Sequence, residues 1–328
     1  MSGSVSPRLT FDVHLGAGDR RAAMEQDVRQ GLTGSPKSLP PVWFYDQRGS
    51  ELFDDITRLP EYYLTRAERS ILVGHAAEIA DLTRADTLVE LGSGTSEKTR
   101  LLLDALAAAG SLRRFVPLDV DADTLRDAAT AISTAYGIDV HAVVGDFHRH
   151  LQKLPAGESR LVAFLGSTIG NLAPVQRHRF LSDLRSAIGV GDHLLLGTDL
   201  VKDRERIRLA YNDASGVTAA FNRNVLTVLN AELGATFDPL SFDHLATWNE
   251  EQRWVEMRLR SQRRQQVEVG ALDLTVRFEA GEDLITEISA KFTAAQVEAE
   301  LSDAGFSLTE RWTDAGADFL LTLATPSG

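Results

Sequence analysis

The sequence contains no cysteine among its 328 residues. This absence excludes disulfide bonds, thiolate zinc sites, iron–sulfur clusters and thiol nucleophiles, and it is typical of a protein from a reducing compartment. Positive charge is also scarce, because 34 Lys and Arg residues face 47 Asp and Glu residues and the net charge is −13. That balance does not favour broad binding to nucleic acid or to an anionic membrane surface.

Long apolar runs are missing as well. No stretch approaches the roughly 20 apolar residues that a membrane-spanning helix needs, and residues 1–20 lack the apolar segment of a secretory signal. We therefore expect a monomeric, cytoplasmic protein without nucleic-acid or membrane partners. Residues 1–20 contain several Ser and Gly residues, and we expect them to be loosely ordered.

Between residues 66 and 201, apolar strand patterns alternate with helical patterns. We predict strands at 87–91, 115–118, 140–144, 161–165 and 193–197, and helices at 65–81, 96–109 and 122–135, with another beginning near Pro174. This alternation indicates an α/β fold whose parallel sheet is buried on both faces. Such sheets bind ligands outside the carboxyl ends of their strands. The polar or glycine residues near those ends are Glu90, Gly92, Asp119, Asp146, Asn171 and Asp199.

After residue 201 the pattern changes. Helices are predicted at 203–213 and 216–232, followed by antiparallel strands at 254–260, 265–269 and 272–278. A last helix at 293–304 and strands near 306–311 and 318–324 are expected to return and complete the parallel sheet. The sequence thus predicts a Rossmann-like sheet formed by 66–201 and 292–328, with an inserted α+β subdomain at 202–291.

The segment VELGSG, residues 89–94, places two glycines between a strand and a helix. Glycine lets the backbone approach a ligand closely, and the helix N-terminus offers free N–H groups. Asp119 ends the next predicted strand, where a carboxylate can accept both ribose hydroxyls of a nucleoside. Taken alone, the glycine pair is also typical of a tight strand–helix turn.

The nucleoside is not expected to be a dinucleotide. Its fingerprint requires a third glycine where this chain has Glu97. S-Adenosylmethionine carries no phosphate and suits an acidic turn better. Lys98 is a candidate partner for its carboxylate, or else a solvated helix charge. Asp146 and Phe147 are candidates for its adenine, or else a helix N-cap and a core phenylalanine.

Eight motifs together resemble a known family. They are PKSLPP (36–41), WFYD (43–46), GSELF (49–53), ITRLPEYY (56–63), ELGSGTSEKTR (90–100), FLGSTIGNL (164–172), GTDLVKD (197–203) and ITEISAKF (285–292). From about residue 20 to the C-terminus, the chain resembles the L-histidine Nα-methyltransferases of ergothioneine biosynthesis. The resemblance implies a class I methyltransferase sheet at 66–201 and 292–328, and a histidine-binding domain at 14–65 and 202–291.

The resemblance also implies an activity and its residues. The expected reaction is three methyl transfers from S-adenosylmethionine to the α-amine of L-histidine, which gives hercynine without a metal. The residues implied for the cofactor are Gly92, Lys98, Asp119, Asp146 and Phe147. Those implied for histidine are Tyr62, Asn171, Tyr211, Glu287 and Ser289.

The chemistry of this reaction suits these residue types. The nucleophile must be a neutral amine, and Tyr62 and Asn171 offer neutral polar groups that do not stabilise the ammonium form; we therefore expect these two to be the catalytic pair. Glu287 and Ser289 lie two apart on a predicted strand and share a face, where they can read the imidazole. Without the resemblance, Glu287 would more commonly be a surface charge and Tyr62 and Tyr211 packing residues.

Other functions are less well supported. His148 and His150 lie two apart, which is not a metal-binding spacing on a helix, and the acidic run at 119–123 lacks the glycine and glutamate of a calcium loop. The segment GSTIG, residues 166–170, has threonine where a hydrolase needs serine. A methyltransferase acting on another amino acid or amine remains an alternative, as does a nucleoside-binding protein that is not an enzyme.

Overall fold

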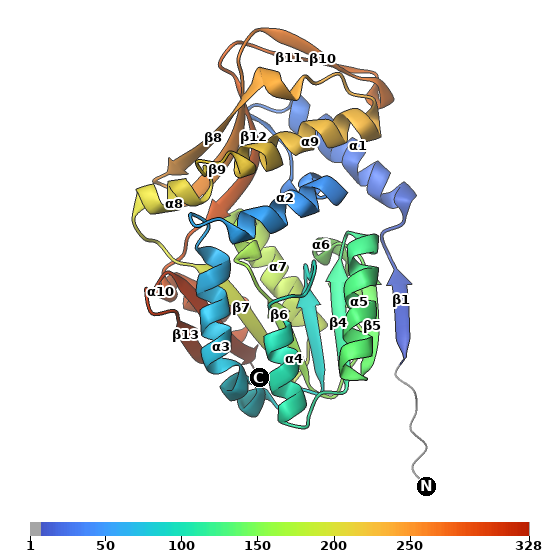
Figure 1. Cartoon of the computed structure of the whole chain (residues 1–328), viewed down its shortest axis with the longest axis vertical. Coiled ribbons are helices and arrows are strands. Elements are labelled where there is room, and N and C mark those ends of the chain that lie inside the picture. The colour runs from blue at the N-terminus through green and yellow to red at the C-terminus, as the bar shows by residue number, and fades with distance from the viewer. Residues whose placement is uncertain (1–7, 328) are drawn as a thin grey trace. The chain divides into compact units, whose positions relative to one another are not determined.

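The computed structural model describes residues 8–327. Within them the chain forms two compact units. The first unit comprises residues 8–15, 64–200 and 292–327, and the second comprises 16–63 and 201–291. Figure 1 colours both by residue number. None of the helices in residues 8–327 has the length and apolar character needed to cross a membrane.

The first unit is built on an eight-stranded sheet with the order β1-β5-β4-β3-β6-β7-β14-β13. The first six of these strands run parallel, which confirms the predicted parallel α/β sheet. Their bounds are β1 Leu9–Val13, β3 Thr87–Leu91, β4 Arg114–Asp119, β5 Asp139–Val144, β6 Arg160–Phe164 and β7 His193–Asp199. The apolar side chains of β3, β4 and β6 are essentially inaccessible to water, as expected for strands covered on both faces.

Helices connect these strands, and most begin and end where the sequence predicts. The helices of this unit are α3 Leu64–Thr83, α4 Arg100–Ala108, α5 Ala122–Tyr136, α6 Phe147–His150, α7 Pro174–Ala187 and α10 Ala294–Asp303. Short 3₁₀ segments lie at Leu151–Lys153 and Thr168–Asn171. Helix α4 begins four residues later than predicted, and residues 97–99 form a turn before it.

Two expectations for this sheet are wrong. The last strands, β13 Phe306–Thr313 and β14 Phe319–Pro326, do join the sheet, but β14 runs antiparallel to β7 and β13 antiparallel to β14. A hairpin after a single helix cannot place both strands in the parallel direction. Residues 9–13 were expected to be loose, yet they form β1 and pair in parallel with β5. Residues 1–7 lie outside the described part of the chain.

The second unit contains a four-stranded sheet with the order β2-β12-β9-β8 and a separate β10-β11 hairpin. The strands are β2 Lys37–Ser38, β8 Phe242–Asn249, β9 Trp254–Ser261, β10 Gln265–Val269, β11 Leu274–Phe278 and β12 Asp283–Ala290. The helices are α1 Ala17–Thr33, α2 Gln47–Arg58, α8 Arg204–Ala210 and α9 Val217–Leu233, with 3₁₀ segments at Pro41–Phe44, Pro239–Ser241 and Gly270–Leu272. Helix α9 packs against α2 and against β8 and β9.

The WFYD and GSELF motifs shape the start of α2. Asp46 caps this helix by accepting the N–H of Gly49 at 2.7 Å. A Cβ on Gly49 would lie 1.9 Å from the carbonyl oxygen of Phe44, so only glycine fits there. Asn224 of α9 donates to the same carbonyl at 3.1 Å and to the Asp46 carboxylate at 2.8 Å. These bonds dock α2 onto α9.

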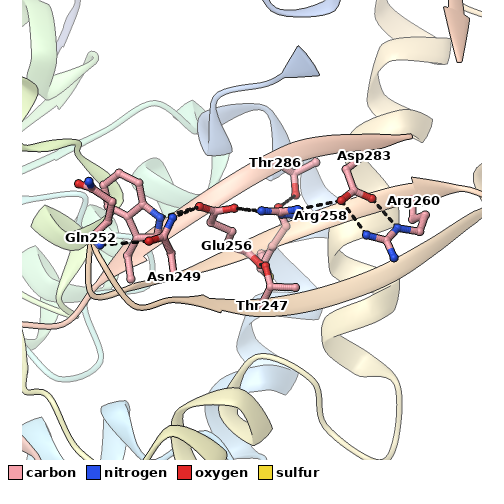
Figure 2. A network of polar contacts seen from close by, with 10 residues as sticks. Thr247, Asn249, Gln252, Glu256, Arg258, Arg260, Asp283 and Thr286 are labelled. Carbon is pink, nitrogen blue, oxygen red and sulfur yellow. Dashed lines mark hydrogen bonds and ion pairs between the residues drawn. The ribbon is translucent and has the colours of Figure 1, made fainter. Parts of the chain in front are cut away.

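Strand β12 carries a bulge between Ile285 and Glu287. Ile285 lies opposite Arg258 of β9, whereas Glu287 lies opposite Met257. Because alternate residues of a strand face opposite sides, the extra residue moves Glu287 to the other face. The face of the sheet on which Ile285 lies also carries a ladder of ion pairs, which Figure 2 shows. The ladder is formed by Glu256, Arg258, Asp283 and Arg260.

Candidate active site

The glycine turn of the first unit follows β3 directly. Gly92 and Gly94 have φ angles of +70° and +48°, a region that favours glycine. The N–H of Gly92 donates to the carbonyl oxygen of Leu118 at 2.8 Å, which ties the turn to β4. A Cβ on Gly92 would lie 3.8 Å from the ring of Phe147. The turn therefore presents backbone, and an aromatic ring lies beside it.

Asp119 lies at the end of β4 and holds the glycine turn. Its Oδ2 accepts the N–H of Gly94 at 2.8 Å, and its Oδ1 accepts the N–H of Asp121 at 3.0 Å. Burial raises the pKa of the Asp119 carboxyl, although the backbone N–H groups of Gly94, Asp121 and Val120 oppose that change. Each oxygen can accept a second hydrogen bond, so the carboxylate fits the two ribose hydroxyls expected from the sequence.

Glu90 and Asp199, which also belong to the strand-end set, are buried. The Glu90 carboxylate accepts the hydroxyl of Ser96 at 2.9 Å and that of Thr99. Burial raises the pKa of Glu90 to about 7. Glu90 thereby braces the turn and the start of α4. Asp199 is fully buried, and its N–H donates to the hydroxyl of Ser167 at 2.9 Å.

Lys98 is paired within the protein. Its Nζ forms an ion pair with Glu68 of α3, a carboxylate that is wholly inaccessible to water. The other oxygen of Glu68 accepts the N–H of Gly166 at 2.8 Å. A Cβ on Gly197 would lie 2.3 Å from this carboxylate, so glycine in β7 makes room for it. The Lys98 side chain is 24% exposed, so its ammonium group can still reach a ligand carboxylate.

Asp146 and Phe147 follow β5, the strand beside β4. Asp146 caps α6 by accepting the N–H of His148 at 2.8 Å. The ring of Phe147 packs edge-on against Phe164 and Phe180, with centroids 5.2 and 5.7 Å apart. Capping and core packing are thus both present, and they hold these half-buried side chains beside the glycine turn. The arrangement fits an adenine ring that needs one acceptor and one apolar surface.

Asn171 ends the 3₁₀ segment after β6. Its side chain is half-buried, and no residue in the range 8–327 forms a hydrogen bond with its amide. Arg177 donates to the carbonyl oxygen of the next residue, Leu172, at 2.8 Å, and forms a bidentate ion pair with Glu300. The backbone that carries Asn171 is therefore fixed while its amide stays available.

In the second unit, Tyr211, Ser289 and Lys291 form one cluster. The two hydroxyl oxygens lie 2.7 Å apart, and Lys291 Nζ donates to that of Tyr211 at 2.8 Å and to that of Ser289 at 2.9 Å. Lys291 is only 1% exposed. The ring of Tyr62 lies edge-on to that of Tyr211, with centroids 6.3 Å apart. A buried ammonium that orders two hydroxyls is suited to bind a carboxylate.

Glu287 differs from every other candidate acid. Its side chain is half-buried, and within residues 8–327 its carboxylate accepts no hydrogen bond. Burial raises the pKa of Glu287 to about 7, and the positive charge of Lys291 opposes this. An unpaired carboxylate on a buried face costs free energy until a donor arrives. The residue is therefore suited to a ligand that brings an N–H group.

The structure groups the predicted residues by unit. The five cofactor candidates and Asn171 belong to the first unit, whereas Tyr62, Tyr211, Glu287 and Ser289 belong to the second. Glu68 and Lys291 were not predicted from the sequence. Lys291 continues the two-residue spacing of Glu287 and Ser289, and that signal was available. Glu68 gave no signal, because its partner is remote along the chain. Residues 8–327 contain no cluster of three or more potential His, Asp or Glu metal ligands.

The chain is similar to known proteins over nearly its whole length. The family model described as "Histidine-specific methyltransferase, SAM-dependent" matches residues 24–326. A histidine N-alpha-methyltransferase of Mycobacterium tuberculosis is 58% identical over 97% of this chain and 99% of its own length. That of Mycolicibacterium smegmatis is 58% identical over 96% of this chain and 99% of its own. Ergothioneine biosynthesis protein 1 of Neurospora crassa is 33% identical over 66% of this chain and 26% of its own.

Proposed function

Because the chain belongs to the histidine-specific, S-adenosylmethionine-dependent methyltransferase family, we propose that it trimethylates the α-amine of L-histidine to give hercynine. In this proposal it carries out the first step of ergothioneine biosynthesis, as a monomer in the cytoplasm, and its substrates are L-histidine and the mono- and dimethylated intermediates. The observation that carries the proposal is Glu287, a half-buried acid without a hydrogen-bond donor in residues 8–327, on a chain 58% identical to two histidine methyltransferases.

The first unit supplies the cofactor site in this proposal. The glycine turn at Gly92 and the carboxylate of Asp119 hold the ribose, Asp146 and Phe147 hold the adenine, and Lys98 meets the methionine carboxylate. The fit is supported by the open acceptor positions of Asp119 and by the aromatic ring beside the turn. When bound, S-adenosylmethionine supplies a methyl group that its sulfonium already activates.

The chain therefore needs to align the amine and keep it neutral. Correct placement at about 3–3.5 Å can supply roughly 7–11 kcal/mol of the barrier. Tyr62 and Asn171 are the groups proposed to contact the amine. Neither carries a fixed negative charge, so neither stabilises the ammonium form as strongly as a carboxylate would. Contacts of this kind can also be given up as each methylation removes an N–H donor.

The second unit supplies the recognition of histidine. Glu287 accepts an N–H of the imidazole, and this bond gives the carboxylate the donor that it lacks in the protein. The sequence argument gave Ser289 to the other ring nitrogen. The bonds of Ser289 to Tyr211 and Lys291 favour a different role, in which this cluster takes the α-carboxylate. A site with such polar partners rejects analogues that lack them by up to ~10⁴–10⁵.

One assay tests the proposal. The purified chain is incubated with S-adenosylmethionine and an equal mixture of the free amino acids, and the products are identified by mass spectrometry. We expect histidine to gain one, two and finally three methyl groups, while methyl transfer to the other amino acids is slower by orders of magnitude. Methylation of tryptophan or another amine in place of histidine would overturn the substrate assignment. Cofactor binding without any methylated product would show that the chain is not this enzyme.

A further inference from the structure

Two buried polar side chains of the second unit, Thr286 and Asn222, and the half-buried His244 form a chain of hydrogen bonds that the proposed mechanism does not use. Thr286 lies at the bulge of β12, and its hydroxyl oxygen is 2.6 Å from Asn222 Oδ1. Asn222 Nδ2 donates to Nδ1 of His244 at 2.8 Å. His244 Nε2 lies 2.8 Å from the carbonyl oxygen of Tyr211. The chain thus runs from the strand that carries Glu287 to the backbone of Tyr211.

The chemistry of these groups fixes each role. The Tyr211 carbonyl can only accept, so Nε2 of His244 carries the proton and Nδ1 is the acceptor. Asn222 therefore donates with its nitrogen and accepts the Thr286 hydroxyl with its oxygen. Asn222 and Thr286 are both 0% exposed. Burial lowers the pKa of His244, which keeps its ring neutral and preserves this pattern.

The bulge decides which face Glu287 occupies. Met257 and Val255, opposite Glu287 and Ser289, are both buried. In a regular strand, Glu287 would share a face with Ile285 and lie among Glu256 and Arg258, on the side with the ion-pair ladder (Figure 2). There an arginine would neutralise it. The single inserted residue is what leaves Glu287 unpaired on the other face.

We propose that Thr286, Asn222 and His244 are positioning residues for histidine specificity, because they hold the β12 bulge that presents Glu287 and tie it to Tyr211. The inference deepens the proposed function and depends on it for the identity of the substrate. The Thr286 hydroxyl lies 3.0 Å from the carbonyl oxygen of Met257 as well as close to Asn222, so it contacts both the neighbouring strand and the helix beneath. Valine at this position would keep the shape and lose both contacts.

The test compares Thr286→Val, Thr286→Ser and the wild type. Each is assayed with histidine and with phenylalanine, which has a ring of similar size without ring N–H groups. For Thr286→Val we expect kcat/KM for histidine to fall roughly tenfold or more, the effect of losing one buried hydrogen-bond donor. We expect little change for phenylalanine, so that the ratio between the two substrates falls. Thr286→Ser should restore the ratio.

Calorimetric binding of S-adenosylhomocysteine is measured on every variant and should not change. The matched control is Thr275→Val, which makes the same exchange at an exposed position of β11. If Thr286→Val does not fold, His244→Phe removes both ring nitrogens and breaks the network from its other end. KM for histidine should then rise severalfold while kcat stays close to that of the wild type.

The inference would be overturned if the ratio of kcat/KM for histidine to kcat/KM for phenylalanine stayed at the wild-type value in the Thr286 and His244 variants. An equal loss of kcat/KM for both substrates would overturn it as well. The proposed function is tested separately, by whether the wild type methylates histidine at all. If another amine proves to be the substrate, the same variants are assayed with that amine.

Discussion

The candidate acids of the two units differ in whether groups of the protein donate hydrogen bonds to them. In the first unit, Asp119 accepts two backbone N–H groups and Glu90 accepts two hydroxyls. In the second unit, Glu287 has no such donor among residues 8–327. Glu90 and Glu287 nevertheless share a pKa raised to about 7 by burial. The two acids therefore carry a similar net penalty for ionisation. For Glu90 it is what remains after Thr99 and Ser96 offset part of the desolvation, whereas for Glu287 no hydrogen-bond donor contributes.

This difference suggests two ways to build a binding site. A group held by the protein is oriented before a ligand arrives, so the ligand loses little freedom on its account. A group left without a donor gains most from the one ligand that supplies it, and penalises ligands that do not. The first arrangement suits a cofactor common to many reactions. The second suits the substrate that must be distinguished.

The largest effect is expected for Glu287→Ala, which removes the unpaired acid. If Glu287 has the proposed role, the imidazole N–H then enters the site without an acceptor, at a cost of about 2–4 kcal/mol, and kcat/KM for histidine should fall on the order of 100-fold or more. Binding of S-adenosylhomocysteine, measured by calorimetry, should be unchanged. Glu268→Ala, at an exposed position of β10, is the control. Unchanged histidine affinity in Glu287→Ala would remove the basis of the comparison.

The next effect is expected for Asp119→Ala, with the opposite pattern. This change removes the proposed acceptor of the ribose hydroxyls and leaves the N–H of Gly94 without its partner. S-Adenosylhomocysteine should bind about 30-fold more weakly, equivalent to about 2 kcal/mol. Histidine binding, measured at saturating cofactor, should be less affected. Asp123→Asn, at the exposed start of α5, serves as the matched control. Equal losses for both ligands would show that the two sites are not independent.

The sequence was informative where local pattern decides the structure. The alternation of apolar strands and helices located β3 to β7 within a residue or two, and the polar positions that follow them include the glycine turn and Asp119. Strand β1 escaped prediction because LTFDV forms a strand only by pairing with β5, about 130 residues further along the chain. Local propensity alone does not contain that information.

The candidate site was harder to predict than the sheet. A spacing of two correctly indicates that Glu287 and Ser289 share a face, but the bulge that chooses the face depends on Asn222 and on the register with β9. The pairing of Lys98 with Glu68 has the same origin, since it needs the packing of α3 beside α4. The motifs therefore named candidate residues, and the tertiary contacts determine which of them already have hydrogen-bond partners within the protein.

A smaller effect is expected for Glu68→Gln, which weakens the orientation of Lys98 and keeps the side-chain volume. Without the carboxylate, the partly exposed Lys98 is free to turn toward water, and S-adenosylhomocysteine should bind roughly tenfold more weakly. Binding of 5′-methylthioadenosine, which lacks the amino-acid group, should not change. In a Lys98→Gln background, Glu68→Gln should have no further effect on the ratio of the affinities for S-adenosylhomocysteine and 5′-methylthioadenosine. Tighter binding of S-adenosylhomocysteine would mean that Glu68 competes with the ligand for Lys98.

The smallest effect is expected in the pH dependence of stability, where Glu287→Gln and Glu90→Gln are compared directly. A carboxyl whose pKa rises from 4.5 to about 7 on folding binds more protons in the folded state, so its contribution to stability falls as pH rises through that window. Urea unfolding between about pH 5 and about pH 8 measures this slope.

Between the two pH values the wild type loses stability, and Glu287→Gln should reduce this loss by about 1 kcal/mol. The figure is well below the full linkage value because water partly reaches the side chain. Saturating histidine should do the same in the wild type, because an imidazole donor stabilises the carboxylate and lowers the Glu287 pKa. Glu90→Gln should leave that histidine effect intact, since its carboxylate is already served by Ser96 and Thr99. If histidine leaves the slope of unfolding free energy against pH unchanged in the wild type, the ligand does not donate a hydrogen bond to Glu287. The difference between Glu90 and Glu287 would then have another cause.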